Sequence, residues 1–244
     1  MAQSYSALTE GADHEMGLGG KLFYAGEMDA RGRALVAAAN IAGAATLAAS
    51  ADGHAQKQAL RDGVADFLVN SLDEALRILK NQLRKREAVS VCAGLGPDAV
   101  EREMEERGVQ PDLLRRYFSI ARDHRALMMH EGEETEVDLR KIPAIVTWNV
   151  ASGRPQELTK LDEIALACLN EDEWEARRWL RLSPRYLSRL AKGLRLVASH
   201  REFAARFQEQ LREHIDRDEI PFAFEACSYF RGVHDQFRCD GGRQ

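Results

Sequence analysis

Between residues 20 and 115 the chain alternates short apolar runs with longer amphipathic segments. The run 22–25 closes at Gly26 and leads into 29–43, whose composition is helical and whose last residue, Gly43, suits a left-handed helix cap. The alternation continues with a strand, a short helix and another strand, at residues 45–50, 55–61 and 66–69. Repetition of strand and helix in this order predicts crossover units.

The next helix is predicted to begin with a capping box, because Ser71 is followed three residues later by Glu74. One stripe of this helix is apolar and should cover a sheet; it comprises Leu72, Ala75, Leu76, Leu79 and Leu83. A strand at 88–94, a helix at 96–108 and an apolar end at 109–114 complete the series. Five strands with helices between them predict a doubly wound, mainly parallel α/β sheet with right-handed crossovers.

After Arg115 the regularity weakens. One further strand is predicted near 141–150, and residues 158–215 have helical composition, with Ser183 and Pro184 suited to the start of one helix. We therefore expect three parts: an N-terminal segment at 1–19, the α/β domain at 20–123 and a mainly helical C-terminal region at 124–244.

Composition narrows the class of protein. With 45% hydrophobic residues, 30% charged residues and a net charge of -5, the chain is a globular protein and neither collagen-like nor wholly disordered. Its basic runs are balanced by nearby acidic residues, so we expect no nucleic-acid partner. No apolar run approaches about 18 residues and the first residues do not resemble a signal peptide, so we expect a cytoplasmic protein with no membrane partner. The four cysteines lack C-x-x-C spacing, which predicts reduced thiols.

Five segments of the α/β region resemble one known family. They read GGKLFYAG, GRALVAAANIAG, LAASAD, SLDEALRILKN and ERGVQPD, in order and in register. They are similar to the central NAD-binding, Rossmann-like domain of urocanase (urocanate hydratase). The resemblance covers about residues 20–115, so the chain resembles a divergent homologue of that domain alone.

In urocanases the oxidised nicotinamide of NAD acts as an electrophile toward the imidazole of urocanate, so the resemblance implies an NAD-dependent lyase. The family holds NAD on a loop resembling GLGGMGGAQ, and the matching residues here are 27–35, in which Gly32 is the one glycine kept. The side chains that should crowd a diphosphate, or repel it, belong to Glu27, Met28, Asp29 and Arg31. Unless Arg31 and Arg33 compensate, we expect that NAD is not bound in the family's manner.

Two further positions differ from the family. The carboxylate that would hold the adenosine ribose falls on Ser50, although Asp52 could replace it. The family's TDQTSAHDP segment corresponds to residues 115–123, which share only Ser119 with it.

Open α/β sheets bind ligands at the carboxyl ends of their strands. The candidate ligand-binding residues are therefore Gly26, Asp29, Arg31, Gly32, Arg33, Ser50, Asp52, Gly94 and Gly96. Each has an alternative interpretation: Asp29 as an ordinary N-cap, the Asp52–His54 pair as a strand-to-helix loop, and the two later glycines as a tight turn.

Other residues have weaker chemical signals. His124 and His130 stand near acidic residues and could bind a metal, but their spacing does not place both on one helix face, and the acidic run suits a solvated loop. We predict no metal site. Cys92 lies inside an apolar strand, which predicts an inert thiol.

The helical region contains large apolar side chains beside arginines, at Trp174, Trp179, Tyr186 and Leu187. They could form a core or a subunit interface, and we expect self-association, as a dimer.

Three hypotheses about function follow. The first is a urocanase-related protein that binds a small anionic or nucleotide-like ligand at the sheet edge without standard hydratase chemistry. The second is an active NAD-dependent lyase that uses Asp29, Arg31 and residues 124–130. The third is a non-catalytic interaction protein.

Overall fold

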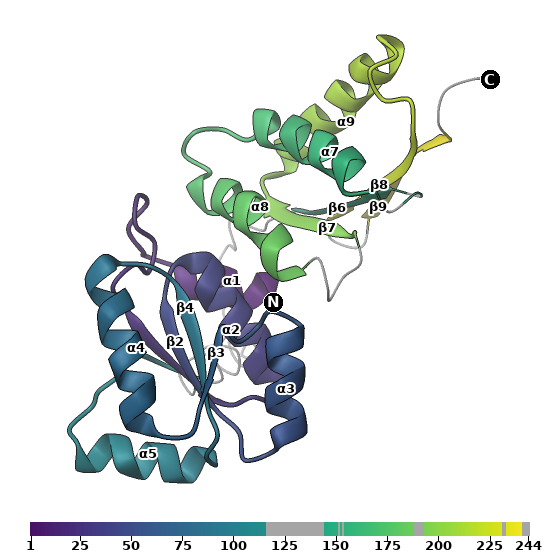
Figure 1. Ribbon diagram of the computed structural model, residues 1–244. Helices are drawn as coiled ribbons and strands as arrows, with labels where there is room; N and C mark the ends of the chain where they lie inside the picture. Colours follow the sequence, from purple (N-terminus) through teal and green to yellow (C-terminus); the bar gives the residue numbers. More distant parts are fainter. Residues whose placement is uncertain (116–143, 151, 153, 188–192, 231–232, 241–244) are drawn as a thin grey trace, which may run out of the picture. The chain divides into compact units, whose positions relative to one another are not determined.

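The computed structural model describes residues 1–115, 144–150, 152, 154–187, 193–230 and 233–240. The chain divides into two compact units, Met1–Glu133 and Glu134–Gln244, and each is considered by itself (Figure 1). Within the described residues, no helix combines the length and the apolar character needed to cross a bilayer.

The first unit alternates strands and helices. Its elements are α1 (Ala2–Thr9), β1 (Leu22–Glu27), α2 (Ala30–Ala42), β2 (Ala45–Ala49), α3 (Gly53–Arg61), β3 (Phe67–Val69), α4 (Leu72–Lys85), β4 (Val89–Ala93), α5 (Pro97–Glu106) and β5 (Leu113–Leu114). The five strands are parallel and lie in the order β3-β4-β2-β1-β5. The predicted doubly wound, Rossmann-like sheet is confirmed.

Helices cover both faces of this sheet (Figure 1). On one face, alternate residues of β1, β2 and β4 form a core with α4 and α5. The helical part of that core is the predicted stripe Leu72, Ala75, Leu76 and Leu79, together with Val100 and Met104. On the other face, α2 packs through residues such as Val36 and Ala37, which are fully buried. Because β2 and β4 are buried on both faces, their sequences are short uncharged runs, which are easily told from the amphipathic helices between them.

Two motifs of the sequence have local structural roles. The Ser71 hydroxyl accepts a hydrogen bond from the Glu74 amide at 3.3 Å, and the Glu74 carboxylate accepts one from the Asn70 amide at 3.3 Å. The predicted cap is therefore present. In a standard capping box the Glu74 carboxylate would bond the Ser71 amide, whereas here it bonds the amide of the preceding residue, Asn70. At the turn before β5, Asp112 accepts a hydrogen bond from the Leu22 amide at 2.8 Å and thereby fixes β5 beside β1.

Residues 1–19 contain a helix that the polar, glycine-bearing pattern did not predict. Tyr5 and Leu8 of α1 are buried, and α1 packs against α2. The Leu18 amide then donates to Ala42 O at 2.8 Å, so the segment is bonded to the end of α2. A helix of eight residues with two apolar anchors is too short to give a clear period.

The second unit is an antiparallel sheet with helices. Its elements are β6 (Ala144–Val150), α7 (Pro155–Cys168), α8 (Trp174–Leu187), β7 (Arg195–Ser199), α9 (Arg201–Asp216), β8 (Ala223–Phe230) and β9 (Val233–Asp240). The strands lie in the order β7-β6-β8-β9, and all neighbours are antiparallel. Trp148 of β6 packs against Phe207 of α9 with ring centroids 5.1 Å apart.

The prediction of one strand in a mainly helical C-terminal region was wrong in part. The expected helices and β6 are present, but β7 replaces the helix expected through 195–199, because Gly193 (φ +91°) interrupts the chain before it. β8 and β9 were not predicted; β8 does alternate buried and exposed residues, whereas the described side chains of β9 are mostly exposed. Ser183 and Pro184 do not begin a helix, since α8 runs through Pro184.

A buried polar group joins three elements of the second unit. The Asp162 carboxylate of α7 accepts hydrogen bonds from Trp148 Nε1 at 2.9 Å and from Arg195 Nε at 2.8 Å. Both partners lie on neighbouring strands, so a single carboxylate sets the position of α7 over β6 and β7. Removal of one partner would leave a buried charge uncompensated.

Trp179 tests whether the aromatic side chains of α8 form a core. Its side chain is 3% exposed, and its Nε1 donates to Leu196 O at 2.5 Å. We expect Trp179→Ala to lower the free energy of unfolding by about 3 to 5 kcal/mol, because it removes a buried aromatic ring. Denaturant unfolding of the full chain measures this. The matched control, Leu182→Ala, lies on the exposed side of α8 and should change stability little; equal losses in both variants would contradict the assignment.

Candidate functional site

The predicted ligand-binding loops meet at the carboxyl edge of the parallel sheet. After β1, the Met28 amide donates to Ala49 O at 2.9 Å. After β2, the Ser50 amide donates to Ala93 O at 3.1 Å, and after β4 the Gly94 amide donates to Val69 O at 2.7 Å. These backbone bonds link the ends of β1, β2, β4 and β3 in sequence, so the loops form one continuous edge (Figure 1).

Gly32 is the closest point between α2 and β1. A Cβ atom on Gly32 would lie 1.9 Å from Glu27 O, a distance that no side chain can adopt. In a dinucleotide-binding fingerprint the third glycine provides this close packing of helix on strand. The one loop glycine kept in the sequence is therefore required by the fold, and its presence says nothing about a ligand.

Gly26 has a different role. Its φ of +68° lies in the left-handed region, at the point where the register between β1 and β2 shifts. The aliphatic part of Arg115 covers it, with Cδ 3.5 Å from the position of a Cβ atom. Arg115, which follows β5, is thereby brought over the β1–α2 loop.

Asp29 is the N-cap of α2, as one of the two predicted interpretations had it. Its Oδ1 accepts a hydrogen bond from the Gly32 amide at 2.6 Å, and its Oδ2 accepts one from Arg115 Nη2 at 2.9 Å. Partial burial acts to raise the pKa of the Asp29 carboxyl, but the bonds from Arg115 and Gly32 outweigh it and hold the pKa below its ordinary value. The loop thus holds a negative charge of its own.

Arg115 completes the loop and was not among the predicted site residues. Its Nη1 donates to Glu27 O at 3.1 Å while its Nη2 binds Asp29. One guanidinium group therefore bonds the last residue of β1 and the cap of α2. Its sequence distance of 86 residues from Asp29 explains why no local pattern indicated the pairing.

Arg33, one of the two arginines that could compensate for the acidic loop, is paired with another carboxylate. That residue forms an ion pair with Asp62 at the end of α3, and Asp62 also accepts a hydrogen bond from Gln58 Nε2 at 2.9 Å. Arg31 is exposed in the first turn of α2. The Met28 side chain is 2% exposed and points into the core, so it does not crowd the loop as expected.

A diphosphate in the family's position does not fit this loop. Such a group would use the amides at the start of α2 and would need glycine where Asp29 stands. Here the Gly32 amide is already bonded to the Asp29 carboxylate, and Arg115 holds that carboxylate in place. The residues present therefore disagree with NAD bound as urocanases bind it.

The loops after β2 and β4 differ from the β1–α2 loop in their polar contacts. Ser50 is buried, and its carbonyl accepts a hydrogen bond from Gln56 Nε2 at 2.7 Å. Asp52 is the exposed N-cap of α3, and its Oδ1 accepts a hydrogen bond from the His54 amide at 2.8 Å. Asp52 thus caps α3, as expected for a residue in a strand-to-helix loop, and its carboxylate is also exposed at the edge of the sheet.

The two glycines after β4 are not equivalent. A Cβ atom on Gly94 would lie 3.3 Å from Val69 O, so close packing favours glycine there. Gly96 is the N-cap of α5, and no described atom lies within 4 Å of the position of its Cβ. The same is true of Gly53, next to Asp52. At these two positions an added methyl group would therefore meet no described atom.

Two buried groups of the sheet, Cys92 and Tyr24, have raised pKa values. Burial, assisted by the charge of Glu27, raises the pKa of the Cys92 thiol to about 11, which agrees with the inert thiol predicted. Burial and then Glu101 raise the pKa of Tyr24, whose hydroxyl donates to Pro97 O at 3.4 Å. Both groups stay protonated at neutral pH.

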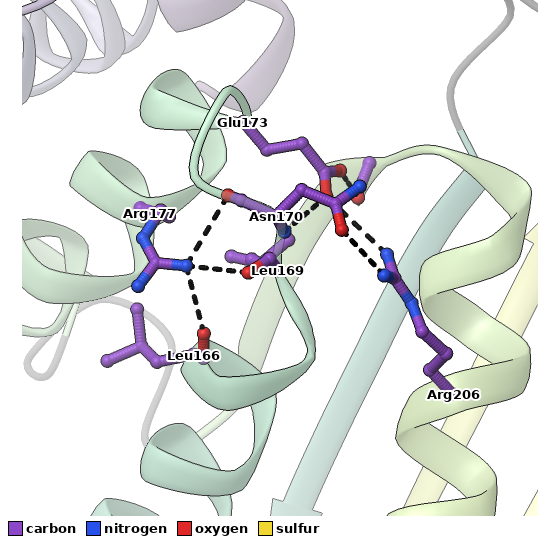
Figure 2. A network of polar contacts seen from close by, with 7 residues as sticks. Leu166, Leu169, Asn170, Glu173, Arg177 and Arg206 are labelled. Carbon is purple, nitrogen blue, oxygen red and sulfur yellow. Dashed lines mark hydrogen bonds and ion pairs between the residues drawn. The ribbon is translucent and has the colours of Figure 1, made fainter.

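A polar network in the second unit was not predicted (Figure 2). The Glu173 carboxylate is buried and accepts hydrogen bonds from the Ser199 hydroxyl and from the Asn170 amide, the latter at 2.8 Å. Arg206 of α9 lies beside them, with Nη1 2.7 Å from Asn170 Oδ1 and Nη2 3.6 Å from Glu173. The network joins the α7–α8 loop to β7 and α9.

Arg177 completes the network from the other side. Its Nη1 donates to Leu169 O at 2.6 Å and to Leu166 O and Asn170 O at 3.4 Å (Figure 2). These carbonyls are at the end of α7, so the guanidinium caps that helix. The network holds this loop against α7 and α9, although Arg206 Nε and Nη2 are buried with no hydrogen-bond partner among the described residues.

Some predicted residues cannot be placed. His124, His130 and residues 116–123 lie outside the described residues. The side chains of Trp179 and Tyr186 are buried within the second unit, which agrees with the core alternative for these two residues. Self-association stays a prediction.

The role of Gly32 can be tested by adding one methyl group. We expect Gly32→Ala to lower the free energy of unfolding by about 3 kcal/mol or more, because its Cβ would overlap Glu27 O. Gly53→Ala, in the first turn of α3, is the matched control and should change stability by less than about 0.5 kcal/mol. Denaturant unfolding distinguishes them, and a stable Gly32→Ala protein would disprove the close packing.

Comparison with known protein families agrees with this structure. The model of the urocanase Rossmann-like domain matches residues 4–124, just under half of the chain. The match extends beyond the resemblance seen at 20–115 and includes most of α1. The N-terminal unit of this chain is therefore similar to the urocanase Rossmann-like domain over residues 4–124.

Proposed function

We propose that this chain is a urocanase-related binding protein that takes a small nucleoside-like ligand at the β2–β4 edge and does not perform urocanate hydration. The observation that supports this proposal is the contrast between the two halves of the edge. In the half beside α2 the Asp29 carboxylate occupies the helix start, whereas in the half beside Asp52 no described atom lies within 4 Å of a Cβ added at Gly53 or Gly96.

The chemistry of the open half suits a hydroxylated ring. Asp52 presents an exposed carboxylate, which accepts hydrogen bonds from vicinal hydroxyl groups as the ribose-binding carboxylate of dinucleotide sites does. The Gly94-Leu95-Gly96 turn has little side-chain bulk, so a flat base can approach its backbone. The anionic part of a nucleotide gains little here, because Asp29 and Asp52 already cap α2 and α3, and the first turn of α5, which has no side-chain cap, contains the negative Asp98.

Binding of adenosine tests this proposal directly. We expect isothermal titration of the full chain to show adenosine binding, and NAD to bind no more tightly than adenosine, since its diphosphate gains no contact. Asp52→Asn should weaken adenosine binding at least about tenfold while keeping the cap, because asparagine is an equally good N-cap.

The matched control is Asp13→Asn. Asp13 also accepts backbone hydrogen bonds, from Met16 at 2.8 Å and Glu15 at 3.0 Å, but it lies near the end of α2, at the opposite edge of the sheet. Adenosine binding should be unchanged in this variant. No heat of binding at millimolar adenosine, or an equal loss in both variants, would remove the proposed site.

The absence of hydratase activity is a separate expectation. Urocanase chemistry needs the nicotinamide of bound NAD, and the loop that would seat its diphosphate contains Asp29 in place of glycine. We expect no decrease in urocanate absorbance when the full chain, at micromolar concentration, is incubated with NAD and urocanate. Turnover that depends on added NAD would contradict the proposal and favour the lyase hypothesis.

A further inference from the structure

We infer that Asp29 and Arg115 are a built-in substitute for a bound diphosphate, which makes the β1–α2 loop complete without a dinucleotide. This inference concerns the closed half of the edge and does not depend on the adenosine proposal. It names a role for Arg115, a residue that neither the motifs nor the resemblance indicated.

The first argument is where the Asp29 carboxylate lies. Close packing at Gly32 fixes the start of α2 directly beside the end of β1. The amides of such a helix start favour a negative group. Asp29 supplies that group from the chain itself, with Oδ1 2.6 Å from the Gly32 amide.

The second argument is the positive partner. Arg115 follows β5, the strand next to β1, and reaches across Gly26 to the loop. Its Nη2 bonds Asp29 Oδ2 at 2.9 Å and its Nη1 bonds Glu27 O at 3.1 Å. A helix N-terminus with an arginine is a common way to hold a phosphate group. Here the same two donors hold a carboxylate.

The third argument is what the pair does for the sheet. β5 has only two residues, and Asp112 fixes its beginning through the Leu22 amide. Arg115 fixes its end through Glu27 and Asp29. The carboxylate is thus part of the connection between β5 and β1, a role that a ligand could perform only when bound.

The test is to remove the internal carboxylate and supply an external anion. We expect Asp29→Gly to lower the melting temperature of the full chain, and sodium pyrophosphate to raise it again by about 3 °C or more, relative to sodium chloride of equal ionic strength. The wild-type protein should show no such difference between the two salts. A wild-type shift as large as that of the variant would overturn the inference.

Two further variants identify the groups involved. Asp52→Gly removes the matching N-cap of α3, where no described arginine binds the cap, and should be destabilised without gaining a response to pyrophosphate. Asp29→Gly combined with Arg115→Gln should lose the response. A response in the Asp52 variant, or in the double variant, would show general anion binding and contradict the assignment.

Asp29→Ala guards against a failure of Asp29→Gly to fold. Alanine removes both carboxylate oxygens, and so frees the Gly32 amide and Arg115, without the added backbone freedom of glycine; this variant should also gain a specific response to pyrophosphate. If neither variant responds, the substitute role is wrong. These results leave the adenosine titration unaffected, so the two proposals can fail separately.

Discussion

The first unit depends on the contact between the first turn of α2 and the end of β1. Because Gly32 has no side chain, its Cα approaches Glu27 O more closely than any other residue would allow. Only Met28 and Asp29 then connect the strand to the helix. This short connection fixes the N-terminus of α2 at the sheet edge, where a negative group is favoured, whether it comes from a ligand or from the chain.

This contact separates the fold of the family from its chemistry. Packing of α2 on β1 needs the glycine at position 32, whereas approach of a diphosphate needs glycine at position 29. The chain keeps the first and has aspartate at the second. A match to the urocanase Rossmann-like domain at residues 4–124 is therefore compatible with a loop that has its own carboxylate in place of a phosphate.

Sequence patterns predicted much of the first unit and less of the second, for physical reasons. Short uncharged strands between amphipathic helices have two distinct periods, so the five parallel strands were found. In the second unit, β7 has five residues next to helical segments, and β9 is an edge strand with mostly exposed side chains, so neither shows a hydrophobic period. Gly193, with its positive φ, was the one signal against a continuous helix.

The candidate site shows the same limit. The cap at Asp29 could be predicted, because capping is local and depends on neighbouring residues. Its ion pair could not, because Arg115 reaches it through the pairing of β5 with β1. Arg33 was the nearer arginine in sequence, yet the fold directs it to Asp62.

Two aspartates with the same local role, as N-caps, thus differ in how far their carboxylate oxygens are already bonded. Asp29 and Asp52 both cap a helix that follows a central strand. Asp29 is bonded on both carboxylate oxygens, one of them to Arg115, which holds its pKa below the ordinary value. The Asp52 carboxylate accepts a hydrogen bond from the His54 amide and is exposed. The charge available at this edge therefore differs from loop to loop, according to the partner that the tertiary fold brings to each cap.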